Sequence, residues 1–318
     1  MNNARRAIGI AAALLAGAHA APGQQAPRLG SGLQRLLEAE LARFPGKAGV
    51  WVKHLTLGEE AGVRADETFN SASVVKIPIM VLAFQMSEKG QLSLSQRIPI
   101  TPADVRGGSG IFRYHDAGLE PTLRDVLLQM IMTSDNTATD LAITRVGGTE
   151  RVNAWLRESG YADGIKLNMT TRELFARYGA LPQGTNVNEK TNTDRAFWLG
   201  DMTPRATGRI LEAMQRCADG TAPAPPIATK PSCTDMMRMM RAQQSGARRL
   251  PHFLSVPVAH KTGDVPPVVA NDVGIIFARS GPIVVSFFAN AIEGSYGEAE
   301  DRIGRIAQQI VGYFDGAR

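Results

Sequence analysis

The stretch Ser73-Val74-Val75-Lys76, followed by the apolar run from Ile77 to Phe84, decides how the fold of this chain is interpreted. The apolar residues predict a buried helix from about Val74 to Phe84. Ser73 and Lys76 are three residues apart, so their side chains face the same way at the start of this helix. A lysine at the start of a buried helix needs a reason to be there, and a chemical role supplies one.

A serine followed by a lysine at this spacing is a candidate nucleophile beside its base. A serine hydroxyl is a poor nucleophile and needs a neighbouring base, and a lysine in a dry cleft near other cations can lose its proton near neutral pH. The Ser73 N–H, at the helix N-terminus, is a candidate oxyanion-hole donor. The alternative is that Ser73 only caps the helix. Alone the pair is weak evidence, because chance produces it about once in a chain of this length.

A second motif, Ser134-Asp135-Asn136, begins 134 − 73 = 61 residues later, at the end of an apolar helix predicted over 123–133. The Ser134 hydroxyl can pass a proton to a leaving nitrogen, and the Asn136 carboxamide can hold a substrate amide with both of its ends. The alternative is a helix N-cap formed by Ser134 or Asp135 before the next helix.

A third motif, Lys261-Thr262-Gly263, lies on a strand predicted from Val258 to Asp264. Lys261 would add positive charge to the cleft, Thr262 would bind a substrate carboxylate, and the Asp264 N–H would be the second oxyanion donor. The alternative is a hairpin of no functional consequence. What raises the significance of the three motifs is their order, spacing and predicted settings.

The elements around these motifs predict two lobes. Both ends of the chain contribute strands to one antiparallel sheet, and the middle forms a helical lobe. A cleft between such lobes is a common place for a small-molecule site. The patterns are a helix over 33–41, a strand pair around Val50 and Val52, helical runs at 123–132 and 141–156, strands at 273–278 and 283–289 joined by a turn at 279–282, and a last helix over 303–314.

Taken together, the motifs resemble the class A β-lactamases and their penicillin-binding relatives, over nearly the whole mature chain. Thr137-Ala138, Leu141, Gly147-Gly148 and Asn271-Asp272 also look like that family. The resemblance implies an α+β, β-lactamase/transpeptidase-like fold, with a helical lobe packed on a five-stranded antiparallel sheet lobe flanked by terminal helices. It implies a catalytic domain over 31–318, with an α/β lobe at about 31–70 and 240–318 and a helical lobe at about 71–239.

One departure from the family pattern concerns the base that frees the acyl-enzyme. Class A β-lactamases use a glutamate on the loop that closes the site. Aligning Leu167 and Leu174 with the two leucines of that loop puts Thr171 at the position of the glutamate, and Glu173 two positions later. Either Glu173 swings in and serves as the base, or deacylation runs slowly through Lys76, or the substrate is another ester or amide.

Two further expectations concern substrate contacts. Many relatives carry an arginine on the strand after the third motif, but residues 268–274 contain none, so Arg248 or Arg249 is a candidate for the substrate carboxylate. The alternative is that both are solvated surface charges. Phe112, in the loop from Gly107 to Tyr114, is the expected apolar wall of the cleft, or else part of the core.

The chain ends and its charge bear on compartment and partners. The sequence predicts a signal peptide over 1–20, with a leader at 21–30. The predicted signal peptide has Arg5 and Arg6 near its start, continues with an apolar run over 7–18 and ends with a small-x-small site at 18–20. The run is too short to span a membrane. We therefore expect a periplasmic or secreted monomer that does not bind membranes after signal removal. The net charge of +5 is scattered and lacks a basic stripe, which argues against nucleic acid.

Cys217 and Cys233 are the two cysteines of the chain. Export favours a disulfide across the proline-rich segment between them, and two unpaired buried thiols are the alternative. No cluster of ligand residues suggests a metal or an organic cofactor.

The sequence thus predicts a serine β-lactamase-like hydrolase that acts on cyclic amides through an acyl-enzyme. The alternatives are a penicillin-binding protein or D,D-peptidase-like acyltransferase with slow deacylation, acting on a peptidoglycan-like acyl substrate, or a non-hydrolytic binding protein. The expected catalytic residues are Ser73, Lys76, Ser134 and Glu173, and the expected substrate contacts are Asn136, Lys261, Thr262, Gly263, Asp264 and Phe112.

Overall fold

A computed structural model of the chain describes residues 31–116, 118–223 and 226–316. The predicted signal peptide (1–20) and leader (21–30) lie outside the described residues. Within the described residues, no helix is long and apolar enough to cross a membrane.

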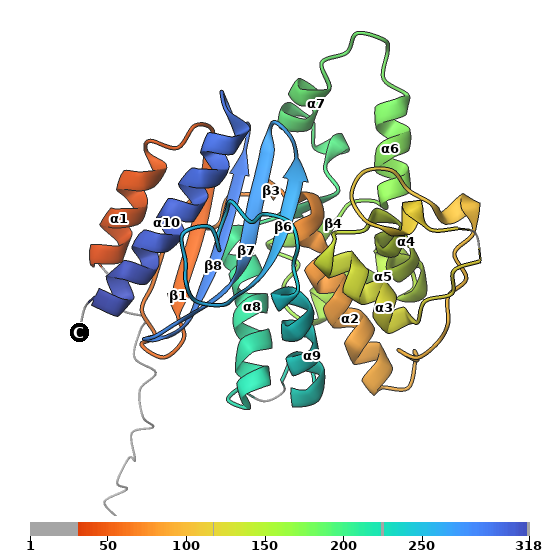
Figure 1. Ribbon diagram of the computed structural model, residues 1–318, viewed down its shortest axis with the longest axis horizontal. Helices are drawn as coiled ribbons and strands as arrows, with labels where there is room; N and C mark the ends of the chain where they lie inside the picture. Colours follow the sequence, from red (N-terminus) through yellow and green to blue (C-terminus); the bar gives the residue numbers. More distant parts are fainter. Residues whose placement is uncertain (1–30, 117, 224–225, 317–318) are drawn as a thin grey trace, which may run out of the picture.

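A five-stranded antiparallel sheet is the centre of one lobe, and both ends of the chain build it, as predicted (Figure 1). Successive side chains of its strands point to opposite faces and so pack into two different cores. Val50 and Val52 belong to one hydrophobic core and Trp51, between them, belongs to the other. The strands, in spatial order, are β2 (Glu60–Val63), β1 (Lys47–His54), β8 (Gly281–Asn290), β7 (Val269–Ala278) and β6 (Val258–Val265).

The two terminal helices, α1 (Ser31–Leu41) and α10 (Tyr296–Gly316), lie side by side on one face of the sheet (Figure 1). The apolar faces predicted from Leu33 to Leu41 and from Ile303 to Phe314 are buried there. The helix α8 (Pro204–Asp219) covers the opposite face, although its residues were expected in the helical lobe. Gly208 permits this contact, because a Cβ atom there would lie 2.1 Å from the Trp51 ring.

The helical lobe surrounds α2 (Lys76–Glu88), whose residues 76–84 are all buried. A short 3-10 turn, η1 (Ala72–Val75), precedes α2, so the helix begins slightly later than predicted. The run predicted over 141–156 is two helices, because Gly147 and Gly148 both have positive φ angles. The neighbouring helices are α3 (Leu123–Met132), α4 (Asn136–Arg145), α5 (Gly148–Glu158) and α9 (Lys230–Arg241).

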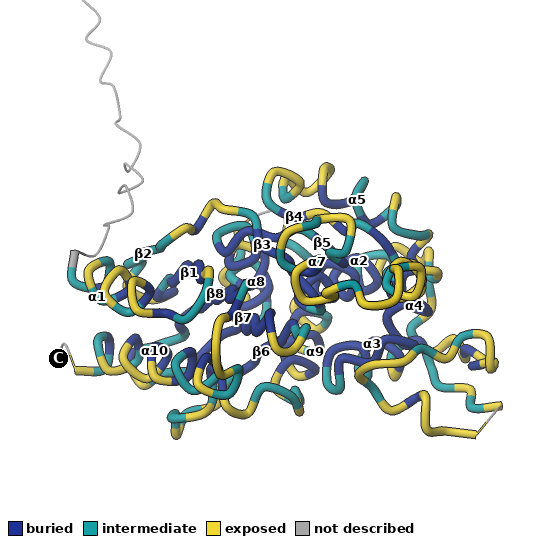
Figure 2. The backbone as a smooth tube through the Cα atoms, turned by 90° about the horizontal axis from the view of Figure 1, so that it is seen from above, coloured by how far each residue is buried: buried dark blue, intermediate teal, exposed yellow. Residues whose placement is uncertain are grey.

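Residues 171–197 form a segment that rises beyond the body of the molecule (Figure 1). We call it the lid segment; it contains α6 (Thr171–Gly179), α7 (Val187–Thr193) and η4 (Arg195–Phe197). Figure 2 shows exposed backbone around α7, in contrast to the buried strands β7 and β8. A small sheet in the order β3 (Phe69–Asn70), β5 (Gly200–Met202) and β4 (Ile165–Leu167) joins both ends of this segment to the residues before Ser73.

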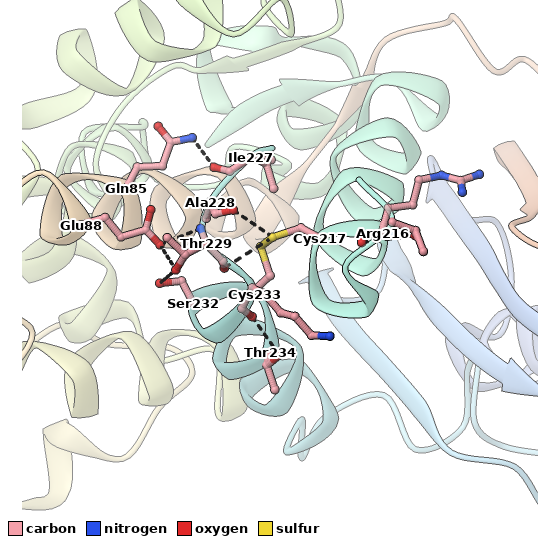
Figure 3. Close-up of a disulfide and its surroundings, with 12 residues drawn as sticks. Gln85, Glu88, Arg216, Cys217, Ile227, Ala228, Thr229, Ser232, Cys233 and Thr234 are labelled. Atoms are coloured by element: carbon pink, nitrogen blue, oxygen red, sulfur yellow. Dashed lines mark hydrogen bonds between the residues drawn. A yellow bond between two sulfur atoms is a disulfide. The ribbon is translucent and has the colours of Figure 1, made fainter. Parts of the chain in front are cut away.

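A disulfide bond joins Cys217 at the end of α8 to Cys233 in α9 (Figure 3). Both cysteines are buried. The bond therefore links the helix that covers the sheet to a helix of the second lobe, and it decides between the two alternatives that the sequence left open.

Candidate active site

A cavity of about 430 Å³ lies where the two lobes and the lid segment meet. Ser73, Ser134 and Asn136 line it from the first two motifs, and Asp264 lines it from the end of β6. Thr171 lines it from the first turn of α6. Residues that are far apart in the sequence therefore share one cavity, as the order of the motifs predicted.

Ser73 lies in the 3-10 turn η1 and remains partly exposed to the cavity. The residue before it, Ala72, has a φ angle of 42°, in the left-handed region that non-glycine residues rarely adopt. Such a conformation costs about 1–3 kcal/mol and persists only where surrounding contacts impose it. The Ala72 N–H donates to Asn70 Oδ1 at 3.0 Å, which is one of these contacts.

Three buried asparagines hold the backbone that leads into Ser73. Asn271 Nδ2 donates to Asn70 O at 2.8 Å and to Ser71 O at 3.1 Å. Asn290 Oδ1 accepts from the Asn70 N–H at 2.7 Å, and Asn290 Nδ2 donates to Asn271 Oδ1 at 3.1 Å. The strands β7 and β8 thereby fix the position of the serine. Sequence reasoning noted Asn271 only as a family likeness, but an asparagine in an apolar strand was a signal for this role.

Gly263 allows β6 to run close beside η1. A Cβ atom at this position would lie 2.5 Å from Ser71 O and 3.0 Å from Val74 Cγ2. Any side chain here would push the strand away from the turn that carries Ser73. The glycine of the third motif therefore brings the end of β6 next to the serine.

Lys76 is completely buried beneath the cavity. Its Nζ donates to Ser134 O at 2.7 Å, to Asn136 Oδ1 at 3.0 Å and to Ser134 Oγ at 3.2 Å. None of these bonds goes to the Ser73 hydroxyl. Burial, followed by the nearby charge of Lys261, holds the pKa of Lys76 well below its usual value. The neutral amine, which can accept a proton, is therefore favoured.

Lys261 contacts the Ser134 hydroxyl group from the other lobe. Its Nζ lies 3.0 Å from Ser134 Oγ and 2.8 Å from Thr262 O. Burial lowers the pKa of Lys261 to about 7, although Asp264 and Asp272 oppose the shift. Ser134 has a φ angle of 55°, and its hydroxyl stands between the two lysines.

The alternative interpretation of the second motif was a helix cap, and the structure contains that cap as well. Asp135 is the N-cap of α4 and accepts from the Ala138 N–H at 2.8 Å. Asn136 has a separate role, because its Nδ2 donates to Gly107 O at 3.0 Å while its Oδ1 binds Lys76. The capping residue and the residues that face the cavity are therefore different members of one motif.

Thr262 is buried, and its Oγ1 lies 2.8 Å from the Oγ of Ser245, which lines the cavity. The two hydroxyls form a polar pair at the side of the cavity that β6 provides. Sequence reasoning missed Ser245, which lies in a loop without a distinctive pattern.

Neither candidate arginine reaches the cavity. Arg248 pairs with Asp301 at the surface. Arg249 is buried and donates to Glu300, to Asn271 O and to the Asp264 carboxylate. The expectation for Arg248 or Arg249 was wrong because carboxylates on neighbouring elements already pair with both guanidinium groups.

Glu173 does not face the cavity. It is exposed and accepts from the Thr170 N–H at 2.7 Å and from Thr170 Oγ1 at 2.9 Å, in a capping box at the start of α6. These bonds from Thr170 lower the pKa of Glu173, which makes it a weaker base. The structure therefore places Glu173 in a helix cap outside the cavity, and Thr171 is the residue that lines the cavity.

Asp140, which sequence reasoning missed, fixes the start of the lid segment. Its carboxylate accepts from the Thr171 N–H at 2.8 Å, from the Arg172 N–H at 3.0 Å and from Arg106 Nε at 2.8 Å. A carboxylate at a helix N-terminus satisfies free N–H groups and interacts well with the helix dipole. Asp140 thereby holds Thr171 in the cavity.

Phe112 is part of the core of the helical lobe. It is 4% exposed and does not line the cavity. Its N–H donates to Asp135 Oδ2 at 2.8 Å, which draws the loop inward. The expectation of an apolar wall at Phe112 was wrong, and the alternative of ordinary core is correct.

Comparisons with known proteins match nearly the whole described chain. The sequence model of the Beta-lactamase enzyme family covers residues 31–314. β-Lactamase VEB-1 of Pseudomonas aeruginosa is 26% identical in an alignment of 262 residues that covers 79% of this chain and 78% of that protein. A β-lactamase crystal structure from Sphaerobacter thermophilus has a TM-score of 0.72 at 28% identity, covering 90% of this chain and 97% of the other. PBP-A shares the fold, with a TM-score of 0.73 at 24% identity and coverage of 91% and 98%.

Proposed function

The chain belongs to the Beta-lactamase enzyme family, and from that premise we propose that Ser73 is the residue acylated by the β-lactam carbonyl. The protein is a hydrolase of the class A β-lactamase type that opens the cyclic amide of β-lactams. One observation carries the assignment of the residues. Lys76 and Lys261, from opposite lobes, both contact Ser134 Oγ beside the cavity that Ser73 lines.

Acylation begins with a proton transfer from Ser73 to the neutral amine of Lys76. Ser73 Oγ forms a bond to the carbonyl carbon, and the N–H groups of Ser73 and Asp264 stabilise the oxyanion. Burial supports this role for Lys76, because it favours the neutral amine. The missing hydrogen bond between Lys76 and Ser73 is compatible with it, since catalytic hydrogen bonds often form only in the substrate complex.

Ring opening requires a proton on the leaving nitrogen. The Ser134 hydroxyl gives its proton to that nitrogen as the C–N bond breaks, and the Lys76 ammonium returns a proton to Ser134. The distance of 3.2 Å between Lys76 Nζ and Ser134 Oγ supports this relay. Lys261, Thr262 and Asn136 hold the substrate, the first two at its carboxylate and the third at its side-chain amide.

Deacylation proceeds without a glutamate base. The only charged residue among the described residues that line the cavity is Asp264, and its carboxylate is bound by Arg249 and Tyr296. Lys76 therefore takes a proton from water as the water oxygen bonds to the ester carbonyl carbon. Lys76 then returns that proton to Ser73 Oγ as the ester C–O bond breaks. Asn70 supports water binding there, because its buried Nδ2 has no hydrogen-bond partner in the described structure. A buried donor of this kind calls for an acceptor such as water.

A chromogenic cephalosporin tests hydrolysis directly when colour and intact protein mass are followed together. We expect an initial burst of about one equivalent, followed by slower continuous turnover, because acylation has a complete set of groups and deacylation lacks a carboxylate. A burst with a lasting mass adduct and no turnover would instead assign the protein to the penicillin-binding, slowly deacylating alternative.

We also propose a compartment for this protein. The protein is exported to the periplasm or secreted as a monomer after removal of residues 1–20, which lie outside the described residues. The disulfide between Cys217 and Cys233 supports an oxidising compartment. N-terminal sequencing of the secreted or periplasmic protein should give a start after Ala20, and light scattering should give the mass of a single chain.

A further inference from the structure

Asp272 is a completely buried carboxylate in β7, beside the strand that carries the third motif. It lies opposite Thr262 in the register of β6 and β7. Two residues away, Gly274 lies opposite His260, so the side chains of His260 and Asp272 are diagonal neighbours on one face of the sheet. A Cβ atom on Gly274 would lie 2.7 Å from His260 Cβ, and its absence leaves room for the imidazole. His260 Nδ1 therefore reaches Asp272 Oδ1, at 2.8 Å.

The same carboxylate holds the segment between α9 and β6. Asp272 Oδ2 accepts a hydrogen bond from the Leu250 N–H at 3.1 Å, and the Leu250 side chain is buried in the core beneath the terminal helices. Arg249, the residue before Leu250, donates from Nη1 to Asn271 O at 2.8 Å. The strand β7 therefore fixes this segment at two neighbouring residues.

Residues 245–250 connect these bonds to the cavity. Gly246 has a φ angle of 75°, and a Cβ atom there would lie 2.4 Å from Thr262 Cγ2, so the segment packs directly on Thr262. Ser245 lines the cavity, and its Oγ lies 2.8 Å from Thr262 Oγ1 and 3.0 Å from Gln243 Oε1. Two hydroxyl groups that bond each other use one proton for that bond and keep a second, which rotates to suit an acceptor. The pair of hydroxyls therefore has a proton to donate to a ligand in the cavity.

We propose that Asp272 and His260 are positioning residues for substrate capture. They hold residues 245–250 against β6, so that the hydroxyls of Ser245 and Thr262 together bind the carboxylate of the β-lactam. This inference rests on the proposed function, in which Thr262 binds that carboxylate. It adds Ser245 as a second hydroxyl at the carboxylate, and it adds two buried residues that act through Ser245.

Benzylpenicillin and its methyl ester separate this role from general destabilisation. The two compounds share the β-lactam ring and the side chain, and the ester has no carboxylate. The quantity to measure is the second-order rate constant for acylation of Ser73, from quenched reactions and intact mass, as the ratio of the acid to the ester. Because both compounds react with the same preparation, this ratio does not depend on how much of the protein is folded.

Three single variants test the proposal. Asp272→Ala removes both bonds of the carboxylate, His260→Ala removes one of them, and Ser245→Ala removes the hydroxyl that they position. We expect the ratio to fall about tenfold in Asp272→Ala and in Ser245→Ala, which is typical for the loss of a hydrogen bond to a charged group. His260→Ala should lower the ratio less, because the bond from the segment to Asp272 remains. An unchanged ratio in Asp272→Ala or in His260→Ala would overturn the proposal.

Asp315→Ala is the matched control. Its carboxylate, on a side chain that is 9% exposed, also accepts a hydrogen bond from a backbone group, the Ser280 N–H at 2.9 Å. It lies at the C-terminal end of α10 and does not line the cavity. This variant should leave the ratio unchanged. A fall as large as in Asp272→Ala would overturn the positioning role, because loss of any such buried carboxylate would then have the same effect.

A double variant separates position from charge. Asp272 also opposes the lowering of the pKa of Lys261, so its loss has a second route to substrate binding. If Asp272 acts through Ser245, Asp272→Ala should lower the ratio much less in the Ser245→Ala background than in the wild type. Equal falls in the two backgrounds would overturn the proposal. Where Asp272→Ala yields no folded protein, His260→Ala takes its place in this comparison.

The wild type distinguishes failure of this inference from failure of the proposed function. We expect the acid to acylate Ser73 faster than the ester does. If neither compound acylates the wild type, the proposed function fails. If both acylate Ser73 at the same rate, the proposed function stands, and this inference fails because the site does not bind the carboxylate.

Discussion

The Nζ atom of Lys261 lies 3.0 Å from the Oγ atom of Ser134, which Lys76 also contacts from the other lobe. Two buried lysines therefore share one hydroxyl group, and the charge of Lys261 lowers the pKa of Lys76. The charges of these two lysines depend on pH, so the activity of the site should depend on pH as well.

The pKa of Lys261, lowered to about 7 by burial, predicts a pH limit on substrate capture. A lysine is charged below its pKa, so Lys261 loses its charge as the pH rises through about 7. In the free enzyme, kcat/KM for an anionic β-lactam should then fall over the same range, because kcat/KM reports the ionisation of the free enzyme. Lys261→Arg, which stays charged, should move this fall to higher pH relative to its own maximum. An unchanged falling limb in that variant would assign it to another group.

The position of Thr171 predicts how deacylation can be accelerated. Thr171→Glu places a carboxylate in the cavity at the first turn of α6, where the helix dipole favours negative charge. General-base catalysis typically contributes about 10²–10⁴-fold, so the acyl-enzyme should decay about a hundredfold faster or more. Its lifetime is measured by intact mass after excess substrate has been removed. Glu173→Gln is the matched control: it alters a carboxylate two residues away that does not line the cavity, so it should leave the lifetime unchanged. If the acyl-enzyme lives longer in Glu173→Gln than in the wild type, Glu173 is restored as the base.

The buried asparagines predict a specific loss of acylation. Asn271→Ala removes the donor to Asn70 O and Ser71 O and also the side-chain acceptor of the buried Ala289 N–H. The free energy of unfolding should fall by about 2–4 kcal/mol. Acylation should slow by roughly tenfold or more, because Ser73 loses its fixed position. Chemical denaturation and burst kinetics measure the two effects.

Gln85→Ala separates positioning from general destabilisation. Gln85 also donates to the Ile227 carbonyl (Figure 3) and accepts from the Trp155 indole. It lies towards the far end of α2 and does not line the cavity. It should lower stability without slowing acylation in the protein that remains folded. If Asn271→Ala and Gln85→Ala affect acylation equally, Asn271 has no positioning role.

The Cys217–Cys233 bond predicts a stability effect without a catalytic one. Cross-linking across a loop of this size stabilises a protein by about 3 kcal/mol in the chain-entropy account. Replacing both cysteines with alanine should lower the free energy of unfolding by about that amount, and kcat/KM at 25 °C should stay the same, since neither cysteine lines the cavity. A marked loss of kcat/KM in the folded double variant would show that the α8–α9 link also shapes the site.

The sequence predicted the parts of the fold that local patterns encode. The motifs at Ser73, Ser134 and Lys261 and the long apolar runs are local, and the structure brings all three motifs together. The three-stranded sheet was missed, because strands of two or three residues such as β3 and β5 have no measurable alternation. Phe112 was misplaced because apolar character alone does not distinguish a core residue from a cavity wall.

The remaining errors come from side-chain partners that were not considered. For Glu173 the partner is local, since Thr170 lies three residues earlier in a Thr-x-x-Glu capping pattern, and for the others it is distant along the chain. Glu173 was considered as a base, but its bonds to Thr170 create a cap, and the N–H groups of α6 depend on Asp140, about 30 residues earlier. Arg249 was considered for the substrate, but Glu300 and Asp264 pair with it. Three-dimensional packing decides such pairings, and composition does not reveal them.

The most direct test of the central claim is the location of the acyl group. Wild-type protein is mixed with benzylpenicillin, quenched in acid within seconds and digested, and the peptides are sequenced by mass spectrometry. The account predicts one added penicilloyl mass on Ser73, and none in Ser73→Ala. A penicilloyl group on another residue, or an equal adduct in Ser73→Ala, would contradict Ser73 as the nucleophile.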